Sequence, residues 1–283
     1  MNFKKINFLL LAVMFVSLSS CNKDEMDQIH EEPTSAKKQV RELSDTELQK
    51  ISDLHLNANE VKYESFTLPG GESEMRILIE GDIAMTPQQL KEMKPLRIDS
   101  KQYRTYNLVS SPRTINVIGY TGTGYGQNLS AKQRNALQAA VANYNSLNIG
   151  LNFTLTFGTN ISPYDIVVFQ EPNGEAGGVA GFPSNGNPYK YVQIFSGMEN
   201  YSTATNQHVI THEIGHTLGM RHTDWDTRAS CGQSGEAAGN DGAVHIPGTP
   251  YGYDSNSIML ACFGANEDGN FGYYDTVAFD YLY

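Results

Sequence analysis

The most regular pattern of apolar and polar residues lies between positions 113 and 195. Residues 151–157 read Leu-Asn-Phe-Thr-Leu-Thr-Phe, and this alternation predicts a half-buried strand. Residues 131–147 carry apolar side chains at helical spacing and predict a helix with one apolar stripe. Four more strands are expected, at residues 114–119, 166–169, 178–182 (an edge strand) and 191–195. Strand, helix and then several strands before a long helix predict an α/β layer arrangement.

Shorter patterns precede residue 113. Ser44 and Glu47 have the spacing of a capping box in front of apolar residues, which predicts a short helix. Thr86 and Pro87 resemble an N-cap followed by proline at the first helical position, and predict a second short helix through about Lys94. Residues 75–79 predict a strand between these two helices.

Composition and charge exclude several classes of protein. The 283 residues include 20 Lys and Arg against 31 Asp and Glu, a formal net charge of -11. Such a chain repels phosphate backbones, so we expect no nucleic acid among its partners. The length fits one large domain or two smaller ones. Three cysteines are too few for a small fold held together by disulfides.

The N-terminus predicts export. Lys4 and Lys5 precede an apolar run over residues 6–18, which is too short to cross a bilayer but is typical of a signal peptide. The run ends in Leu-Ser-Ser-Cys, which resembles a bacterial lipobox and predicts lipid attachment at Cys21. Ordinary secretory cleavage beside an incidental cysteine is the alternative. We therefore expect a lipoprotein of the outer membrane, exposed at the cell surface.

Four segments are predicted along the chain. They are a lipoprotein signal peptide at 1–21, a polar tether at 22–43, a propeptide at 44–112 and a catalytic domain at 113–283. The start of the tether, Asn-Lys-Asp-Glu, resembles the export tag of surface lipoproteins of the Bacteroidota, although a plain solvated segment explains it equally well. Proteolytic processing would release the catalytic domain from its anchor.

Residues 212–222 read His-Glu-Ile-Gly-His-Thr-Leu-Gly-Met-Arg-His and carry the chemistry. On a helix, His212 and His216 lie about 40° apart and roughly 6 Å apart along the axis, so both imidazoles can reach one ion. Zinc suits these ligands, and three protein ligands with an open fourth position are typical of a catalytic site. Gly219 can reverse the chain so that His222 approaches the same ion. His208 fits no ligand position and is expected at the surface.

Glu213 follows the first ligand and would hydrogen-bond the water on zinc as the general base. The three histidines and this glutamate match the metzincin motif H-E-x-x-H-x-x-G-x-x-H. Together with the following Arg-His-Thr-Asp-Trp, they resemble the bacterial HEIGH metallopeptidases. The resemblance implies a zinc metalloendopeptidase with a mixed five-stranded sheet, an active-site helix and a loop-rich C-terminal subdomain ending in a helix. It also implies that Met259 forms the Met-turn below the metal.

The chain departs from the astacin pattern at two places. Astacins and serralysins carry a tyrosine two residues after the Met-turn methionine, and this chain has Ala261 there. Thr223 follows the third histidine, where astacins have glutamate. We therefore expect zinc itself and backbone donors of the edge strand to stabilise the transition state.

The predicted propeptide contains Ile-Glu-Gly-Asp-Ile at residues 79–83, which resembles the astacin propeptide motif. In that family the aspartate occupies the water position on zinc, so the resemblance implies that Asp82 blocks the metal and makes the chain a zymogen. A solvent-facing Gly-Asp turn after a strand is the alternative.

Cys231 and Cys262 are expected to pair, because the location is oxidising and Cys21 is committed to lipid. The bond would tie the segment of Met259 to the chain beyond His222. The Asn-Glu-Asp-Gly-Asn sequence at residues 266–270 is a weak candidate for calcium, since such a loop is more often a plain turn.

These features predict a lipid-anchored zinc endopeptidase that acts on proteins or peptides as a monomer. The substrate would add antiparallel to the edge strand at 178–182, and Glu213 would carry the proton from water to the leaving amine. A zinc-stabilised surface lipoprotein that binds without catalysis is the alternative, and an amidase acting on peptidoglycan peptides is a third hypothesis.

Overall fold

The computed structural model describes residues 41–94, 104–225, 227–233, 246–250 and 253–283. The described residues all belong to one compact unit of the chain, Val40–Tyr283. The predicted signal peptide, most of the tether and the lipid-attachment residue Cys21 lie outside them. No helix in the described part is both long enough and apolar enough to cross a bilayer.

The larger sheet has five strands in the order β5-β4-β6-β8-β7. Four of them run parallel: β4 (Arg113–Tyr120), β5 (Leu151–Gly158), β6 (Ile166–Glu171) and β8 (Tyr191–Phe195). The edge strand β7 (Gly178–Val179) is antiparallel to β8. The mixed α/β fold class and the five-stranded mixed sheet predicted from the sequence are thus confirmed. β7 is shorter than the predicted strand at 178–182.

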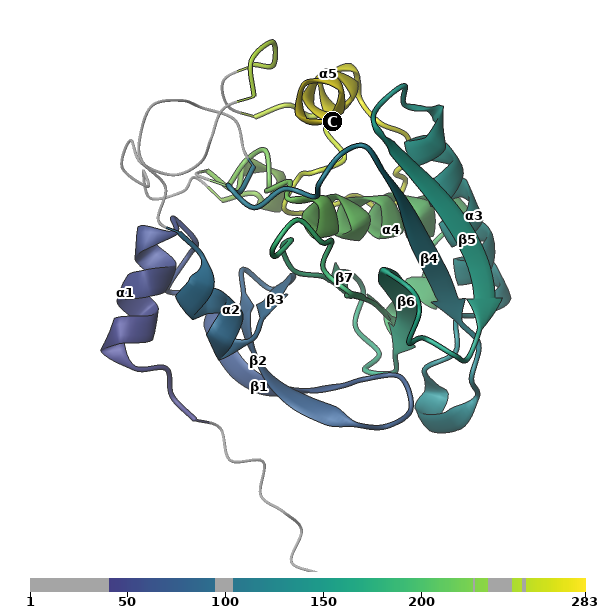
Figure 1. Ribbon diagram of the computed structural model, residues 1–283, viewed down its shortest axis with the longest axis horizontal. Helices are drawn as coiled ribbons and strands as arrows, with labels where there is room; N and C mark the ends of the chain where they lie inside the picture. Colours follow the sequence, from purple (N-terminus) through teal and green to yellow (C-terminus); the bar gives the residue numbers. More distant parts are fainter. Residues whose placement is uncertain (1–40, 95–103, 226, 234–245, 251–252) are drawn as a thin grey trace, which may run out of the picture. The chain divides into compact units, whose positions relative to one another are not determined.

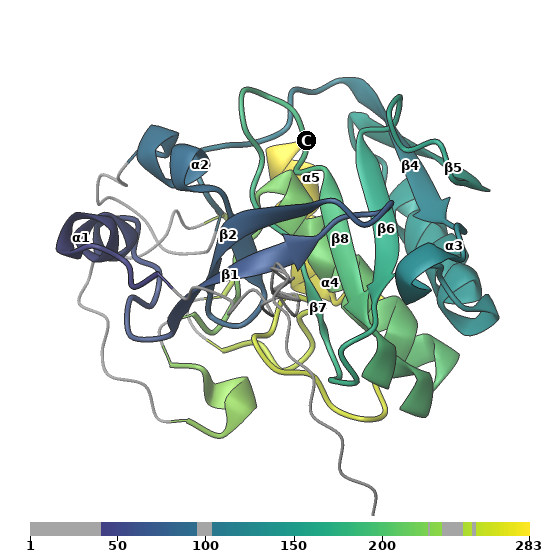
Figure 2. The same cartoon turned by 90° about the horizontal axis from the view of Figure 1, so that it is seen from below.

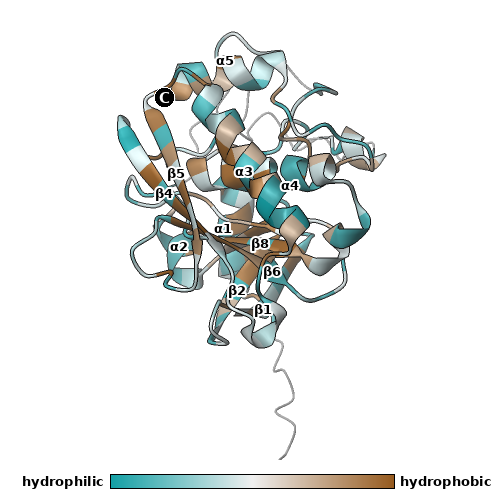
Figure 3. Cartoon of the chain, turned by 90° about the vertical axis from the view of Figure 1, so that its right-hand side faces the viewer, coloured by the Kyte–Doolittle hydropathy of each residue, from teal (hydrophilic) through white to brown (hydrophobic). Residues whose placement is uncertain are grey.

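Two helices pack against this sheet, and a third contributes residues to the same apolar core. They are α3 (Ala131–Ser146), α4 (Thr203–Leu218) and α5 (Tyr273–Leu282), and Figure 1 shows α3 and α4 against the strands. The capping box between Ser130 and Gln133 begins α3, and the side chain of Ser202 accepts from Thr205 N at the start of α4. The central strands β6 and β8 are mostly buried, as expected for parallel strands covered on both faces. β5 alternates between buried and exposed residues, and Figure 3 shows both hydrophobic and hydrophilic stretches along β4 and β5.

Residues 41–94 form a smaller layer of their own. The antiparallel sheet β1-β2-β3 (Val61–Thr67, Ser73–Ile79 and Ile83–Met85) packs with α1 (Asp45–Asp53) and α2 (Pro87–Glu92) around a separate apolar cluster. The predicted capping box at Ser44 and the predicted N-cap at Thr86 are both present, and Thr86 also forms a capping box with Gln89. The strand predicted at 75–79 is β2, whereas β1 and β3 were not predicted.

The smaller layer is attached to the edge of the larger sheet, as Figures 1 and 2 show. Ile83 pairs with Ala180 in a parallel bridge just beyond β7. Ala84 N donates to Ala180 O at 2.6 Å, and Ala180 N donates to Asp82 O at 2.9 Å. Phe182 packs into the cluster of the smaller layer. The chain at residues 82–84 therefore occupies the free edge where the sequence predicted an antiparallel substrate, and it runs in the opposite direction.

Candidate metal centre

The end of α4 determines how the three histidines meet. The helix ends at Gly219, whose φ of 108° lies in the left-handed region that favours glycine. A Cβ at this position would lie 2.6 Å from Asn107 O, so space as well as backbone conformation requires glycine. Beyond this turn the chain reverses and brings His222 back towards the helix. The sequence-based interpretation of Gly219 is confirmed.

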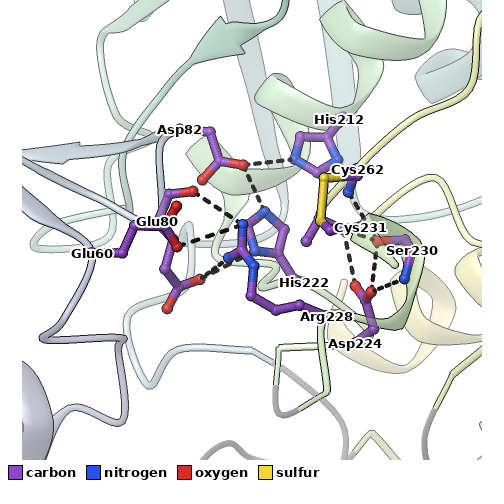
Figure 4. Close-up of a disulfide and its surroundings, with 11 residues drawn as sticks. Glu60, Glu80, Asp82, His212, His222, Asp224, Arg228, Ser230, Cys231 and Cys262 are labelled. Atoms are coloured by element: carbon purple, nitrogen blue, oxygen red, sulfur yellow. Dashed lines mark hydrogen bonds and ion pairs between the residues drawn. A yellow bond between two sulfur atoms is a disulfide. The ribbon is translucent and has the colours of Figure 1, made fainter. Parts of the chain in front are cut away.

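Four side chains form a cluster of potential ligand atoms: Asp82, His212, His216 and His222. One ligand atom from each lies within 4.8 Å of the other three. Asp82 Oδ2 is 2.9 Å from His222 Nε2 and 3.8 Å from His212 Nε2, and Figure 4 shows its carboxylate directed at both rings. The three predicted histidines and Asp82 therefore lie together, although more than a hundred residues separate Asp82 from the helix.

The ring nitrogens facing away from the cluster are hydrogen-bonded. His212 Nδ1 bonds to Ile258 O at 2.9 Å, and His216 Nδ1 bonds to Met220 O at 2.8 Å. The partner of His222 Nδ1 is a carboxylate oxygen of Glu80, at 3.2 Å. Such outer partners fix the ring orientation and leave Nε2 free for a metal. For His222 this partner comes from the predicted propeptide.

Met259 lies beneath the cluster. Its side chain is fully buried, and a Cβ added to Gly215 on α4 would come within 2.5 Å of its sulfur atom. A backbone hydrogen bond also joins this segment to the residue after His222, since Thr223 N donates to Met259 O at 2.8 Å. The methionine thus packs against the helix that carries two of the histidines, in the position that the sequence predicted for a Met-turn.

Glu213 faces the cleft beside the histidines. The cleft has a volume of about 270 Å³, and Glu213, His212 and Gly178 of β7 contribute to its lining. Glu213 is buried, and its Oε2 has no hydrogen-bond partner among the described residues. Burial, and then the charge of Asp82, raise the pKa of Glu213 well above its usual value. A carboxyl group in this environment is suited to accept and release a proton.

The pKa values of the other groups in the cluster depend on burial and on the charges of their neighbours. Burial opposes the charged form of His222, but Asp82 and Glu80 outweigh it and raise the pKa of this histidine to about 9. Burial, together with the two neighbouring histidines, lowers the pKa of His216 well below its usual value. Burial opposes the charged form of Asp82 as well, yet the adjacent histidines hold its pKa well below the usual range.

The donor set fits a metal ion. Three imidazoles and one carboxylate converge with their outer nitrogens already occupied, and this combination is typical of a metal site. Asp82 Oδ1 and Glu213 Oε2 are buried carboxylate oxygens without a hydrogen-bond partner in the described structure, as expected where a cation and water complete the site.

A disulfide joins Cys231 and Cys262, which were predicted to pair, with their Cα atoms 5.1 Å apart. Asp224 connects the same two segments, because it accepts hydrogen bonds from Ser230 N at 2.8 Å and from Ala261 N at 2.9 Å. Figure 4 shows these residues beside His222. The segment after Met259 is therefore held to the chain that follows the third histidine.

Sequence reasoning missed four residues around the site. Glu80, Arg221 and Arg228 form a buried charged group next to His222. His208 was expected at the surface, but only 6% of it is exposed and it lines the cleft. Its position one turn before His212 on a buried helix was the signal that could have located it. No local pattern predicts the contact between Glu80 and His222.

A helix with two histidines one turn apart, a third histidine after a glycine turn and a glutamate beside them at the edge of a mixed sheet define a metallopeptidase. The chain belongs to the family described as dual-action HEIGH metallopeptidases, whose model matches residues 77–283. The match begins within β2 and therefore includes the segment of Glu80 and Asp82.

Solved structures add two similar proteins, both titled as myroilysin. One shares 14% identity and aligns over 60% of this chain and 79% of its own, with a TM-score of 0.39. The other shares 14% identity over 69% of this chain and 95% of its own, with a TM-score of 0.38. Comparison with curated protein sequences gave no match.

Proposed function

We propose that this metallopeptidase is a zinc endopeptidase of the metzincin type, made as a lipid-anchored zymogen. His212, His216 and His222 would hold the zinc ion, and Asp82 of the propeptide (residues 44–112) would block the fourth position. The observation that carries the proposal is the convergence of one carboxylate and three imidazoles within 4.8 Å, directly beside Glu213. Calcium at residues 266–270 stays a prediction.

His212, His216 and His222 would hold a zinc ion whose Lewis acidity would assist the attack of water on the scissile carbonyl. Glu213 takes the proton from the attacking water and delivers it to the departing amine nitrogen. Burial raises the pKa of Glu213 above its usual value, which favours a carboxyl group that holds the proton between the two transfers. The backbone of β7 and of the residues after it binds the substrate chain and positions its carbonyl over the cluster.

The contacts of residues 82–84 support latency. They use both the N–H and the C=O of Ala180, which an added substrate strand would need. The chain at residues 82–84 runs parallel to this edge, whereas the predicted substrate runs antiparallel to it. The peptide bonds of residues 82–84 therefore have the opposite direction to those of a substrate. A segment with reversed polarity fills the site without presenting a cleavable bond in the productive orientation.

Replacing Glu213 with Gln tests the mechanism. The variant Glu213→Gln should retain stoichiometric zinc, measured by atomic emission, and should lose casein hydrolysis by at least about a hundredfold, because the amide cannot accept the proton. Asp280→Asn, a change at an exposed carboxylate of α5, serves as the control. Undiminished hydrolysis by Glu213→Gln would refute this role. A wild-type protein that holds zinc but cleaves neither casein nor murein peptides would instead favour a binding lipoprotein.

A further inference from the structure

Arg228 lies between the cleft and the predicted propeptide. Its side chain contributes to the lining of the cleft together with His212 and Glu213, and only 9% of the residue is exposed. Nη1 lies 3.7 Å from Glu80 Oε2, and Nη2 donates to Glu80 O at 3.3 Å. Figure 4 shows the guanidinium group directed at Glu80, close to His222. A positive charge is therefore buried at the border of the candidate active site.

The carboxylates that pair with Arg228 in the described part of the chain belong to the predicted propeptide. They are Glu80 and, at 3.9 Å, the half-exposed Glu60. Arg221 contacts the same glutamate, with Nη2 3.8 Å from Glu80 Oε1. A buried guanidinium group is costly unless an acceptor faces it. Removal of the propeptide takes Glu80 away and leaves Arg228 facing the cleft.

The hydrogen bonds of Arg228 are incomplete even with Glu80 in place. Its Nε and Nη1 are buried and have no hydrogen-bond partner among the described residues. On the helix side of the same cleft, Nε2 of the buried His208 also lacks a partner. The remaining lining is mostly small or apolar, including Val209, Leu260 and Phe263. Glu80 and Asp82 of the predicted propeptide and Glu213 of α4 are the carboxylates that line this cleft, so loss of the propeptide would leave the donors of Arg228 without their present acceptor.

We propose that Arg228 forms a subsite for an acidic side chain of the substrate next to the cleaved bond, which Glu80 fills in the unprocessed chain. The inference rests on the proposed peptidase function. A guanidinium group binds carboxylates through parallel hydrogen bonds and has several donors to offer. The net charge of -11 does not oppose this, because charges more than about 10 Å away are screened at physiological salt.

Paired peptides test the subsite on the active preparation obtained from the full-length chain. Each pair is identical except for Glu or Gln at one position, and the substituted position is moved through the four residues on either side of the cut. At one position, Glu should raise kcat/KM roughly 10- to 100-fold over Gln, as expected for a hydrogen bond to a charged group. Wild-type enzyme that cleaves both members of every pair equally would overturn the proposal.

Variants at Arg228 assign the preference. Arg228→Gln should abolish it, Arg228→Lys should retain part of it, and Arg228→Glu should favour the matching Lys peptide. Arg134→Gln, at an arginine of α3 that does not line the cleft, is the control and should keep the wild-type ratio. A Glu preference that persists in Arg228→Gln would overturn the assignment to this residue. If that variant does not fold, a Glu-to-Gln ratio in the wild type that is unaffected by salt would contradict the ionic contact.

Loss of the proposed peptidase activity and loss of the acidic subsite give different results. Wild-type protein that hydrolyses no peptide in the set and no casein would overturn the proposed function, and the subsite with it. Hydrolysis of the peptides without a preference for Glu at any position would leave the peptidase in place and overturn only the acidic subsite.

Discussion

Two buried carboxyl groups at the metal centre differ in what surrounds them. Asp82 follows Gly81 on a turn, and its Oδ2 lies 2.9 Å from His222 Nε2, so it can act as a ligand. Glu213 is fixed on α4 between the histidine positions, and its Oε2 has no partner. Their charges oppose each other, because Asp82 contributes to the raised pKa of Glu213. Removing Asp82 should therefore free one coordination position on the metal. It should also lower the pKa of Glu213, because the neighbouring negative charge is lost.

The role of Asp82 as a ligand can be tested by spectroscopy. In a Glu213→Gln background, which stops self-digestion, the unprocessed chain is loaded with cobalt(II). The further change Asp82→Ala should alter the visible absorption, because a protein carboxylate is replaced by solvent in the coordination sphere. Asp53→Ala, at an exposed residue of the same predicted propeptide, should leave the spectrum unchanged. Identical spectra for the Asp82 and Asp53 variants would exclude Asp82 from the site.

Among the secondary-structure elements, α5 supports the metal centre from a distance. Asp275 accepts hydrogen bonds from Ser257 Oγ at 2.7 Å and from the N–H groups of Ile258 and Gly272, each at 2.8 Å. The carbonyl group of Ile258 in turn holds Nδ1 of His212. The C-terminal helix, the Met259 segment and the first metal ligand are therefore connected by successive hydrogen bonds. The loss of Asp275 should weaken both folding and metal binding.

Asp275 also predicts a dependence of stability on pH. Burial raises its pKa from 3.8 to about 6, against the hydrogen bonds that favour the charged form. Because the folded-state pKa is the higher one, its contribution to the free energy of unfolding is full below about pH 4 and is lost as pH rises through about 6. Asn resembles the protonated carboxyl group, so Asp275→Asn should match the wild type at pH 4 and exceed it in stability above pH 6.

Urea denaturation from pH 4 to 7.5 measures this difference. Asp275→Ala should be less stable than Asp275→Asn by about 1–3 kcal/mol at every pH, because buried N–H groups lose their acceptor. Asp280→Ala, at an exposed residue on the same helix, is the control. A constant gap between wild type and Asp275→Asn over the whole range would show that burial does not raise this pKa.

Elements whose contacts are local could be predicted, whereas those that depend on distant partners could not. The alternation at 151–157 and the stripe of α3 describe β5 and α3 closely, since each buries one face against the same core. By contrast β3, which covers only Ile83–Met85, depends on pairing with β2 and on the bridge to Ala180. The motif likewise identified the cluster of histidines, but Glu80 meets His222 across 142 residues, and no local spacing contains that contact.

At the scale of the whole molecule, non-covalent contacts hold the predicted propeptide on the catalytic part. They include the bonds at Ala180, the donation from Arg221 Nη2 to His55 O at 2.6 Å and the proximity of Asp82 to the histidines. If Cys21 carries the lipid, contacts of this kind would attach the catalytic part to the membrane once the chain is cut between the two parts. Latency and anchoring would then depend on the same interface.

Controlled cleavage of the anchored chain can test this link. A recognition sequence for a site-specific protease is inserted between residues 95 and 103 of the Glu213→Gln chain, which is expressed in a host that lipidates exported proteins. The uncut chain should sediment with membranes, and Cys21→Ala should not. After cutting, the catalytic fragment should stay largely in the pellet, whereas Asp82→Ala or a chelator should move it to the supernatant, because the link through the metal is lost. Equal release of the fragment with and without Asp82 would show that anchoring does not depend on the contact that blocks the metal. An uncut chain found in the supernatant would refute the lipid anchor.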